Sequence, residues 1–204
     1  MISIIDYGVG NVLAFANMYK RMNIEFNLVN NAEQLMQAER IILPGVGSFD
    51  HAMERLNNSG MRDVLDRRVL EDKIPVIGIC VGMQMLAKSS DEGSESGLGW
   101  IDAQVKKFDV SQFSQKTHLP HMGWNDINPQ KEHKILKGLE QDARFYFLHS
   151  YYFECENSEN VLATSDYGGS FCCLANVGNI YGVQCHPEKS HSFGAQLLKN
   201  FSEL

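Results

Sequence analysis

The chain has 204 residues, of which 44% are apolar, so it can bury a substantial core and is not a disordered protein. Its 18 Lys and Arg against 25 Asp and Glu leave a formal charge of −7, which disfavours nucleic acid and anionic membranes as partners. The apolar stretch over residues 74–87 is interrupted by Pro75 and Gly78 and falls short of the ~18 residues that a membrane-spanning helix needs. The N-terminus shows no basic segment followed by a cleavable apolar one, so we expect a cytoplasmic protein.

The first half of the chain alternates short β-branched runs with segments of helical periodicity. This pattern is typical of a parallel sheet covered by helices on both faces. Asn11 is a predicted helix N-cap, because apolar residues recur at helical spacing after it, from Val12 to Met22. We expect strands over residues 2–5, 24–29, 40–43 and 74–79, and helices over residues 12–22, 32–37, 49–56, 61–70 and 81–88.

After Gly99 the strand-like runs follow one another with turns between them. We expect strands over residues 103–108, 144–153, 161–164, 171–175 and 180–184, and a final helix over residues 192–201. No repeat, Pro-rich linker or charge block divides the chain. The prediction is therefore one α/β domain over residues 1–204, a three-layer, open, mostly parallel sheet with an antiparallel extension.

The segment Gly-Ile-Cys-Val-Gly at 78–82 lies where a buried strand must turn sharply into a helix. Small residues on both sides of a nucleophile permit the strained turn of a nucleophile elbow. Cys80 would then lie at a helix N-terminus, where unpaired N–H groups favour the thiolate that attacks carbonyl carbons. The alternative is a buried structural cysteine, but the flanking glycines and the strand-to-helix context favour the nucleophile.

A thiolate nucleophile needs a proton carrier whose pKa is near neutrality. His186 lies in a His-Pro-Glu tripeptide that directly follows a predicted strand. Period-two geometry puts His186 and Glu188 on the same side of an extended chain, so that the carboxylate can orient the imidazole. By itself this tripeptide is as consistent with an ordinary loop. The sequence indicates no partner residue for four other histidines, His51, His118, His133 and His191.

A second strand ends in Pro-Gly-Val-Gly at 44–47, on the same carboxyl edge of the predicted sheet. Its glycines permit a backbone N–H to point at a developing oxyanion, beside the N–H of Val81. The alternative is a plain strand-to-loop turn. Gly8 and Gly10 superficially suggest a dinucleotide-binding loop, but position 13 is Leu and no acidic residue ends the second strand, so we reject it.

The cysteines of the chain suggest neither a disulfide framework nor a zinc site. The five cysteines are an odd number and contain no Cys-x-x-Cys pair. We expect packing roles for Cys155, Cys172, Cys173 and Cys185. No metal and no cofactor is expected.

The segment at 78–84 together with His-Pro-Glu at 186–188 resembles the triad glutamine amidotransferases, a family that shares a Cys-His-Glu hydrolytic centre. Further segments are similar to one branch, the glutaminase subunits of imidazole glycerol phosphate synthases, over residues 44–47, 120–125, 149–152 and 186–190. The resemblance covers essentially the whole chain.

This resemblance implies that Cys80 attacks the carboxamide of glutamine, that His186 carries the proton and that Glu188 orients the imidazole. It implies an oxyanion hole made by the N–H groups of Val46 and Val81. The substrate's amino-acid end would be held by Gly47, Gln84, Ser150 and Tyr151. The implied partner is a (β/α)8 cyclase subunit, joined in a heterodimer, which receives the ammonia and is contacted by Trp124, Tyr146 and Lys189.

Other functions remain consistent with the same residues. Similar paralogues supply ammonia for amidino-sugar formation in surface-polysaccharide biosynthesis, and residues 101–102 and 191–194 are closer to that branch. A free-standing γ-glutamyl hydrolase would use the same Cys-His-Glu centre, and a binding module would have kept the fold and lost the reaction. The synthases for anthranilate, guanylate and carbamoyl phosphate usually carry Gly-Gly at the position of Gly45-Val46-Gly47, which makes them weaker alternatives.

Overall fold

The computed structural model describes residues 1–113 and 118–204. The N-terminal half forms parallel strands whose order in the sheet is β2-β1-β3-β4. Their bounds are β1 Ile2–Ile5, β2 Phe26–Val29, β3 Ile41–Gly45 and β4 Val76–Cys80. Ile4, Ile42 and Val76 are fully buried, as expected for strands covered on both faces.

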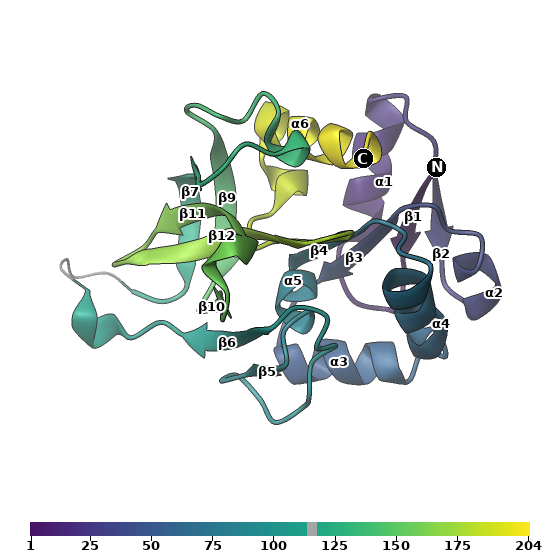
Figure 1. The fold of residues 1–204 in the computed structure, drawn as a ribbon, viewed down its shortest axis with the longest axis horizontal. Coiled ribbons are helices and arrows are strands. Elements are labelled where there is room, and N and C mark those ends of the chain that lie inside the picture. The colour runs from purple at the N-terminus through teal and green to yellow at the C-terminus, as the bar shows by residue number, and fades with distance from the viewer. Residues whose placement is uncertain (114–117) are drawn as a thin grey trace.

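Helices cover both faces of this sheet. They are α1 Val12–Arg21, α2 Ala32–Leu35, α3 Phe49–Asn57, α4 Arg62–Asp66, α5 Val81–Met85 and α6 His191–Ser202. In Figure 1 α1 and α6 lie on one side of the sheet, and α3, α4 and α5 lie on the other. The predicted N-cap is confirmed, since the Asn11 side chain accepts the Ala14 N–H at 3.3 Å. The three-layer α/β prediction is confirmed as well.

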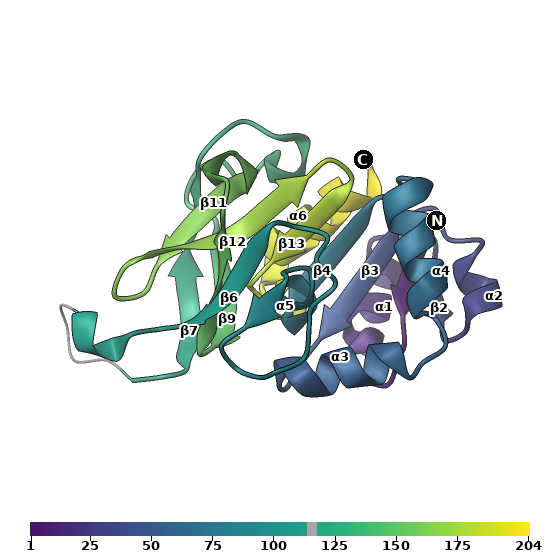
Figure 2. The ribbon, with the colours of Figure 1, turned by 60° about the horizontal axis from the view of Figure 1, so that its bottom comes forward.

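The second half extends the sheet beyond β4 (Figure 2). Strand β13 pairs parallel with β4, and the antiparallel pairs β13-β12, β12-β10 and β10-β6 follow, while β5 pairs parallel with β6 at the edge. Strand β11 pairs antiparallel with β12 and β8. Their bounds are β5 Ser89–Ser90, β6 Ala103–Lys107, β8 Asn128–Pro129, β10 Tyr151–Cys155, β11 Val161–Asp166, β12 Ser170–Val177 and β13 Ile180–Val183.

Two predicted elements are wrong in detail. Residues 144–153 do not form one strand, because the chain passes from one sheet to another at Ser150: β9 (Arg144–His149) pairs antiparallel with β7 (His121–Asp126), whereas β10 belongs to the main sheet. The helix expected over residues 81–88 ends at Met85, because the chain then turns to place β5 beside β6.

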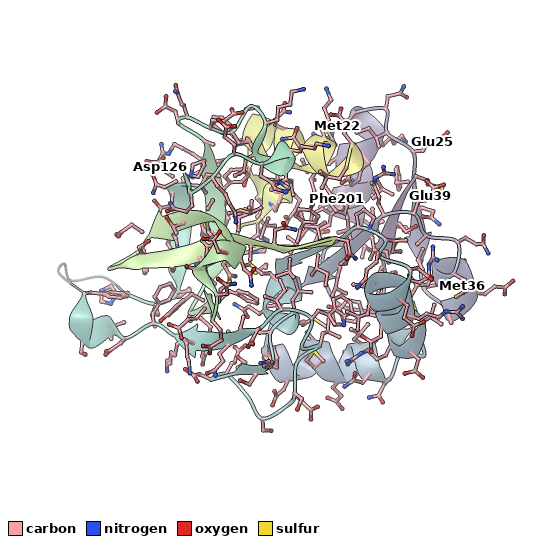
Figure 3. The ribbon with its side chains drawn as sticks, viewed as in Figure 1. Met22, Glu25, Met36, Glu39, Asp126 and Phe201 are labelled. Atoms are coloured by element: carbon pink, nitrogen blue, oxygen red, sulfur yellow. The ribbon has the colours of Figure 1, made fainter. Side chains whose placement is uncertain are left out.

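Aromatic side chains fill the space between α6 and the sheet. Phe201 is fully buried there (Figure 3), with its ring centroid 6.2 Å from that of Tyr181 on β13. Short 3₁₀ turns connect the later strands at Val110–Gln112, Lys134–Leu136, Ser158–Asn160 and Pro187–Lys189, and a π-helical turn, Arg67–Glu71, follows α4. Over residues 1–113 and 118–204, no helix combines the length and apolar character needed to cross a bilayer.

Candidate active site

The turn from β4 into α5 holds Cys80 in a strained backbone conformation. Cys80 has φ 56° and ψ −114°, a combination that L-residues rarely adopt and that costs about 1–3 kcal/mol. A Cβ on Gly82 would collide with the Leu43 carbonyl, and a Cβ on Gly78 would collide with the Gly82 carbonyl. Only glycine fits at these two positions, so the local geometry is that of the nucleophile elbow expected from the sequence.

His186 and Glu188 lie beside this elbow because β13 is the parallel neighbour of β4. The Nδ1 of His186 is 2.8 Å from Oε1 of Glu188, and the two side chains are only 6% and 4% exposed. The His186 N–H donates to the Tyr146 carbonyl at 2.8 Å, which fixes the backbone of this turn. Geometry therefore brings together the three residues that the sequence selects from opposite ends of the chain.

The electrostatics of His186 favour its protonated form. Burial by itself lowers the pKa of His186, but hydrogen bonds to Cys80 and Glu188 outweigh it and raise the pKa to about 10. An imidazolium beside the sulfur stabilises a thiolate, and the carboxylate of Glu188 balances the charge on the far side of the ring. This arrangement can attack a carbonyl carbon and protonate the group that leaves.

A cavity of about 310 Å³ opens onto Cys80. It lies within the size range of small-molecule sites. Strand pairing places Gly45 opposite Cys80, so the loop that follows β3 forms one wall. Of the residues selected from the sequence, the cavity is lined by Val46, Gly47, Cys80, Val81, Gln84, Ser150, Tyr151, His186 and Lys189.

The family model of the class-I glutamine amidotransferases matches residues 3–203. The chain belongs to the class-I glutamine amidotransferases. It is 57% identical over 204 residues to the imidazole glycerol phosphate synthase subunit HisH of Bdellovibrio bacteriovorus, and 53% identical to that of Leptospira borgpetersenii, with full coverage of both chains in each case. A crystal structure of a glutamine amidotransferase superposes with a TM-score of 0.76 at 22% identity, covering 99% of this chain and 97% of the other, which shows the shared fold.

Four further residues of this amidotransferase line the cavity, and the sequence analysis assigned a site role to none of them: Glu92, Leu148, and Pro120 and His149 from the segments 120–125 and 149–152. Glu92 follows β5, and its Oε2 accepts the N–H of Phe49 at 2.8 Å, which ties the loop to the first turn of α3. Asp50 accepts the N–H groups of Ser94 and Glu95, and these bonds lower its pKa. Glu92 brings a carboxylate to the cavity that no local sequence pattern indicates.

Gln184 is a second residue that the sequence analysis missed. Its side chain is fully buried, and its Nε2 donates to the Cys80 sulfur at 3.9 Å. Its Oε1 accepts from Nε2 of Gln84 at 3.1 Å. Gln184 precedes His186 by two positions, and period-two spacing was the signal that could have found it.

The residues expected at a partner interface lie together on the surface next to the cavity. Trp124 and Tyr146 are paired across β7 and β9, with ring centroids 6.3 Å apart, and Nζ of Lys189 lies 5.5 Å from the Tyr146 ring centroid. His191, for which the sequence names no partner, stacks on Trp124 at 5.1 Å. Met122 and Trp124 are 62% and 42% exposed. An exposed apolar patch therefore adjoins the amidotransferase cavity.

The other cysteines occupy different surroundings from Cys80. Cys172, Cys173 and Cys185 are buried, and Cys155 is half-buried. Burial raises the pKa of the Cys173 and Cys185 thiols, which keeps them protonated and inert. These positions agree with the packing roles expected from the sequence.

Proposed function

We propose that this chain is the glutaminase subunit of an imidazole glycerol phosphate synthase. It would hydrolyse glutamine to glutamate and ammonia and pass the ammonia to a (β/α)8 cyclase subunit. The observation that carries the proposal is the Cys80, His186 and Glu188 constellation beside a cavity of about 310 Å³. The names of the relatives at 57% and 53% identity favour this reaction over amidino-sugar formation and over a free-standing γ-glutamyl hydrolase.

In the first half of the proposed reaction, the Cys80 thiolate attacks the side-chain carboxamide carbon of glutamine. The negative charge moves to the carbonyl oxygen, where the N–H groups of Val46 and Val81 stabilise it. The carbon–nitrogen bond then breaks, and the leaving nitrogen takes the proton of the His186 imidazolium. Ammonia leaves, and a γ-glutamyl thioester remains on Cys80.

In the second half, neutral His186 accepts a proton from water as the water oxygen attacks the thioester. The carbon–sulfur bond breaks, glutamate is released, and the thiolate and imidazolium form again. Glu188 keeps the imidazole oriented and stabilises its charged form in both steps.

The amino-acid end of glutamine carries an ammonium group and a carboxylate. We assign the ammonium group to Glu92, whose carboxylate lines the cavity. Gly47, Gln84, Ser150 and Tyr151 would surround the remainder of that end. Because the ammonium group is not part of the reacting carboxamide, its pairing with a carboxylate contributes to substrate binding rather than to the chemical step.

The proposed cyclase partner explains the exposed apolar patch beside the cavity. Ammonia released into neutral water becomes protonated and loses its nucleophilicity, so its transfer requires a closed, docked interface. Trp124 and Tyr146, with Met122 beside them, offer the aromatic and methionine side chains that protein interfaces favour. Lys189 borders both this patch and the cavity.

The proposal is tested with the purified chain and a cyclase subunit, by measuring synthase activity with either glutamine or ammonium salt as nitrogen donor. Cys80→Ala is expected to lower glutamine-dependent activity by about 10³-fold or more and to leave ammonia-dependent activity unchanged. Cys155→Ala is the matched control and should alter neither. Retention of glutamine-dependent activity in Cys80→Ala would refute the assignment, and fast hydrolysis that the cyclase does not increase would favour a free-standing hydrolase.

A further inference from the structure

Two buried histidines form the centre of a hydrogen-bonded chain that starts in β7. The Nδ1 of His121 lies 3.0 Å from the Nε2 of His149, and the two buried residues are opposite each other in the pairing of β7 with β9. On one side, Nδ2 of Asn125 lies 3.2 Å from Nε2 of His121. On the other, Nδ1 of His149 lies 2.7 Å from the carbonyl oxygen of Tyr151.

The same chain continues without interruption to the nucleophile. Nε2 of Gln84 donates to the Tyr151 carbonyl at 3.2 Å and to Oε1 of Gln184 at 3.1 Å. Nε2 of Gln184 then donates to the Cys80 sulfur at 3.9 Å. A line of polar groups therefore runs from β7 in the small sheet, through the β9–β10 junction, to the elbow at the end of β4.

Only one placement of the protons satisfies this chain. The Asn125 amide is oriented by its surroundings, because its Nδ2 also donates to the Asp166 carbonyl at 2.7 Å and its Oδ1 accepts the Asp126 N–H at 2.9 Å. His121 must therefore accept at Nε2 and donate from Nδ1 to His149, and His149 must donate from Nδ1 to the Tyr151 carbonyl. Both rings are neutral in this arrangement.

The surroundings of the two rings support that assignment. His121 is stacked between Phe147 and Tyr167, with ring centroids 4.9 and 4.1 Å away and interplanar angles of 17° and 20°. Stacking on both faces fixes the plane of the ring and hence the directions of its two nitrogens. Burial lowers the pKa of His121 to about 4 and the pKa of His149 to about 3, so that neither ring is charged at neutral pH.

We propose that Asn125, His121, His149 and Gln184 are positioning residues, joined in one hydrogen-bonded chain that holds Gln84 and the Cys80 sulfur in their reactive places. This inference rests on the proposed glutaminase function. The direct contact is made by Gln184, whose N–H stabilises the thiolate, and the other three fix the orientation of the amides through the shared Tyr151 carbonyl. A hydrogen bond to an ionised group is among the stronger ones, so the effect on the sulfur is measurable.

The first test replaces Gln184 by an isosteric residue. Gln184→Glu retains the oxygen that accepts from Gln84 and removes the N–H that donates to the sulfur. Gln37→Glu is the control, because it makes the same change of charge at an exposed position. We expect Gln184→Glu to lower kcat about 10- to 100-fold while KM for glutamine changes less than about threefold.

The same variants are compared in the alkylation of Cys80 by iodoacetamide as a function of pH, followed by peptide mass spectrometry. The alkylation midpoint of Gln184→Glu is expected at higher pH than that of the wild type, and the midpoint of Gln37→Glu is expected to be unchanged. The carboxylate of Gln184→Glu raises this midpoint through its charge as well as through the lost N–H. Gln184→Met lacks the N–H donor and adds no charge, so it is measured beside Gln184→Glu and should shift the midpoint in the same direction.

The second test changes the other end of the chain. Asn125→Asp replaces the amide donor by a carboxylate, so Nε2 of His121 must carry the proton. We expect imidazole NMR to show the pKa of His121 rising from about 4 towards neutrality, and kcat/KM to fall about 3- to 30-fold. Asn58→Asp makes the same change at an exposed position and is the control.

The double variant Asn125→Asp with Gln184→Glu decides whether the two ends act as one unit. Its loss in kcat/KM should be smaller than the product of the single losses by at least about threefold. The inference would be overturned if the losses of the two single variants multiplied in the double variant, or if the alkylation profile of Gln184→Met were unchanged. The alkylation assay needs neither glutamine nor a partner. It therefore tests the hydrogen-bonded chain independently, also if the wild type does not hydrolyse glutamine and the proposed function is refuted.

Discussion

Acidification should destabilise this protein through its buried neutral histidines, and His149 gives the clearest case. Burial is the main cause that lowers the pKa of His149 from 6.5 to about 3. The bond to the Tyr151 carbonyl opposes it, and repulsion by the protonated forms of His121 and His186 adds to it. The unfolded chain binds a proton at this ring below about pH 6.5, whereas the folded chain does not until about pH 3. Stability contributed by this ring is therefore present above pH 6.5 and is lost as the pH falls.

The linkage relation converts these two pKa values into a free energy. Between pH 7.5 and pH 5.0, protonation of the unfolded chain at His149 lowers the free energy of unfolding by about 2 kcal/mol. His121, with a pKa lowered to about 4, acts in the same direction. Loss of about 2 kcal/mol is a large fraction of the 5–15 kcal/mol that stabilises a typical domain.

The assay is urea unfolding followed by tryptophan fluorescence at pH 7.5, 6.0 and 5.0, for the wild type and for His149→Phe. Phenylalanine preserves the ring packing against Phe108 and Phe171 but cannot titrate. The change in unfolding free energy between pH 7.5 and 5.0 should be about 2 kcal/mol smaller in the variant. Carboxylates that also lose stability in acid, such as Asp50, are shared by both proteins and cancel in this difference. Identical pH dependence in the two proteins would refute the reasoning.

The other predictions concern the cavity and the elbow. Gly82→Ala should lower the free energy of unfolding by about 3 kcal/mol in urea titrations, because the new Cβ meets the Leu43 carbonyl; an unchanged midpoint would contradict the close approach. Glu188→Gln should lower kcat about 100-fold and move the alkaline limb of the kcat/KM profile to lower pH, since the pKa of His186 is held at about 10 by Cys80 and by Glu188 and loses the second of these supports. An alkaline limb at the wild-type position would argue against that support. Glu92→Gln should raise KM for glutamine about 10-fold with little change in kcat, and an unaltered KM would assign the ammonium group elsewhere.

Much of the fold was predictable because its signals are local. Apolar residues recur at helical spacing after Asn11, which predicts a helix with one buried face. The continuous β-branched runs of β1, β3 and β4 predict strands that are buried on both faces. Strand β7 was missed because its exposed positions carry the apolar Met122 and Trp124 with Gly123 between them, and because its pairing with β9 depends on residues far along the chain. The continuous strand expected over residues 144–153 failed because no local pattern marks the passage between two sheets.

The sequence by itself predicted the tight turn at Cys80 and the pairing of His186 with Glu188. Gly78 and Gly82 lie within two residues of Cys80, and the spacing of His186 and Glu188 is set by backbone geometry alone. The turn and the His-Glu pair could therefore both be predicted from the sequence. Only the tertiary structure decided that Glu92 faces the cavity, that Gln184 touches the sulfur and that His121 meets His149. Those contacts join separate strands and loops, and the order of strands in a sheet is chosen by the packing of the whole chain rather than by any one segment of it.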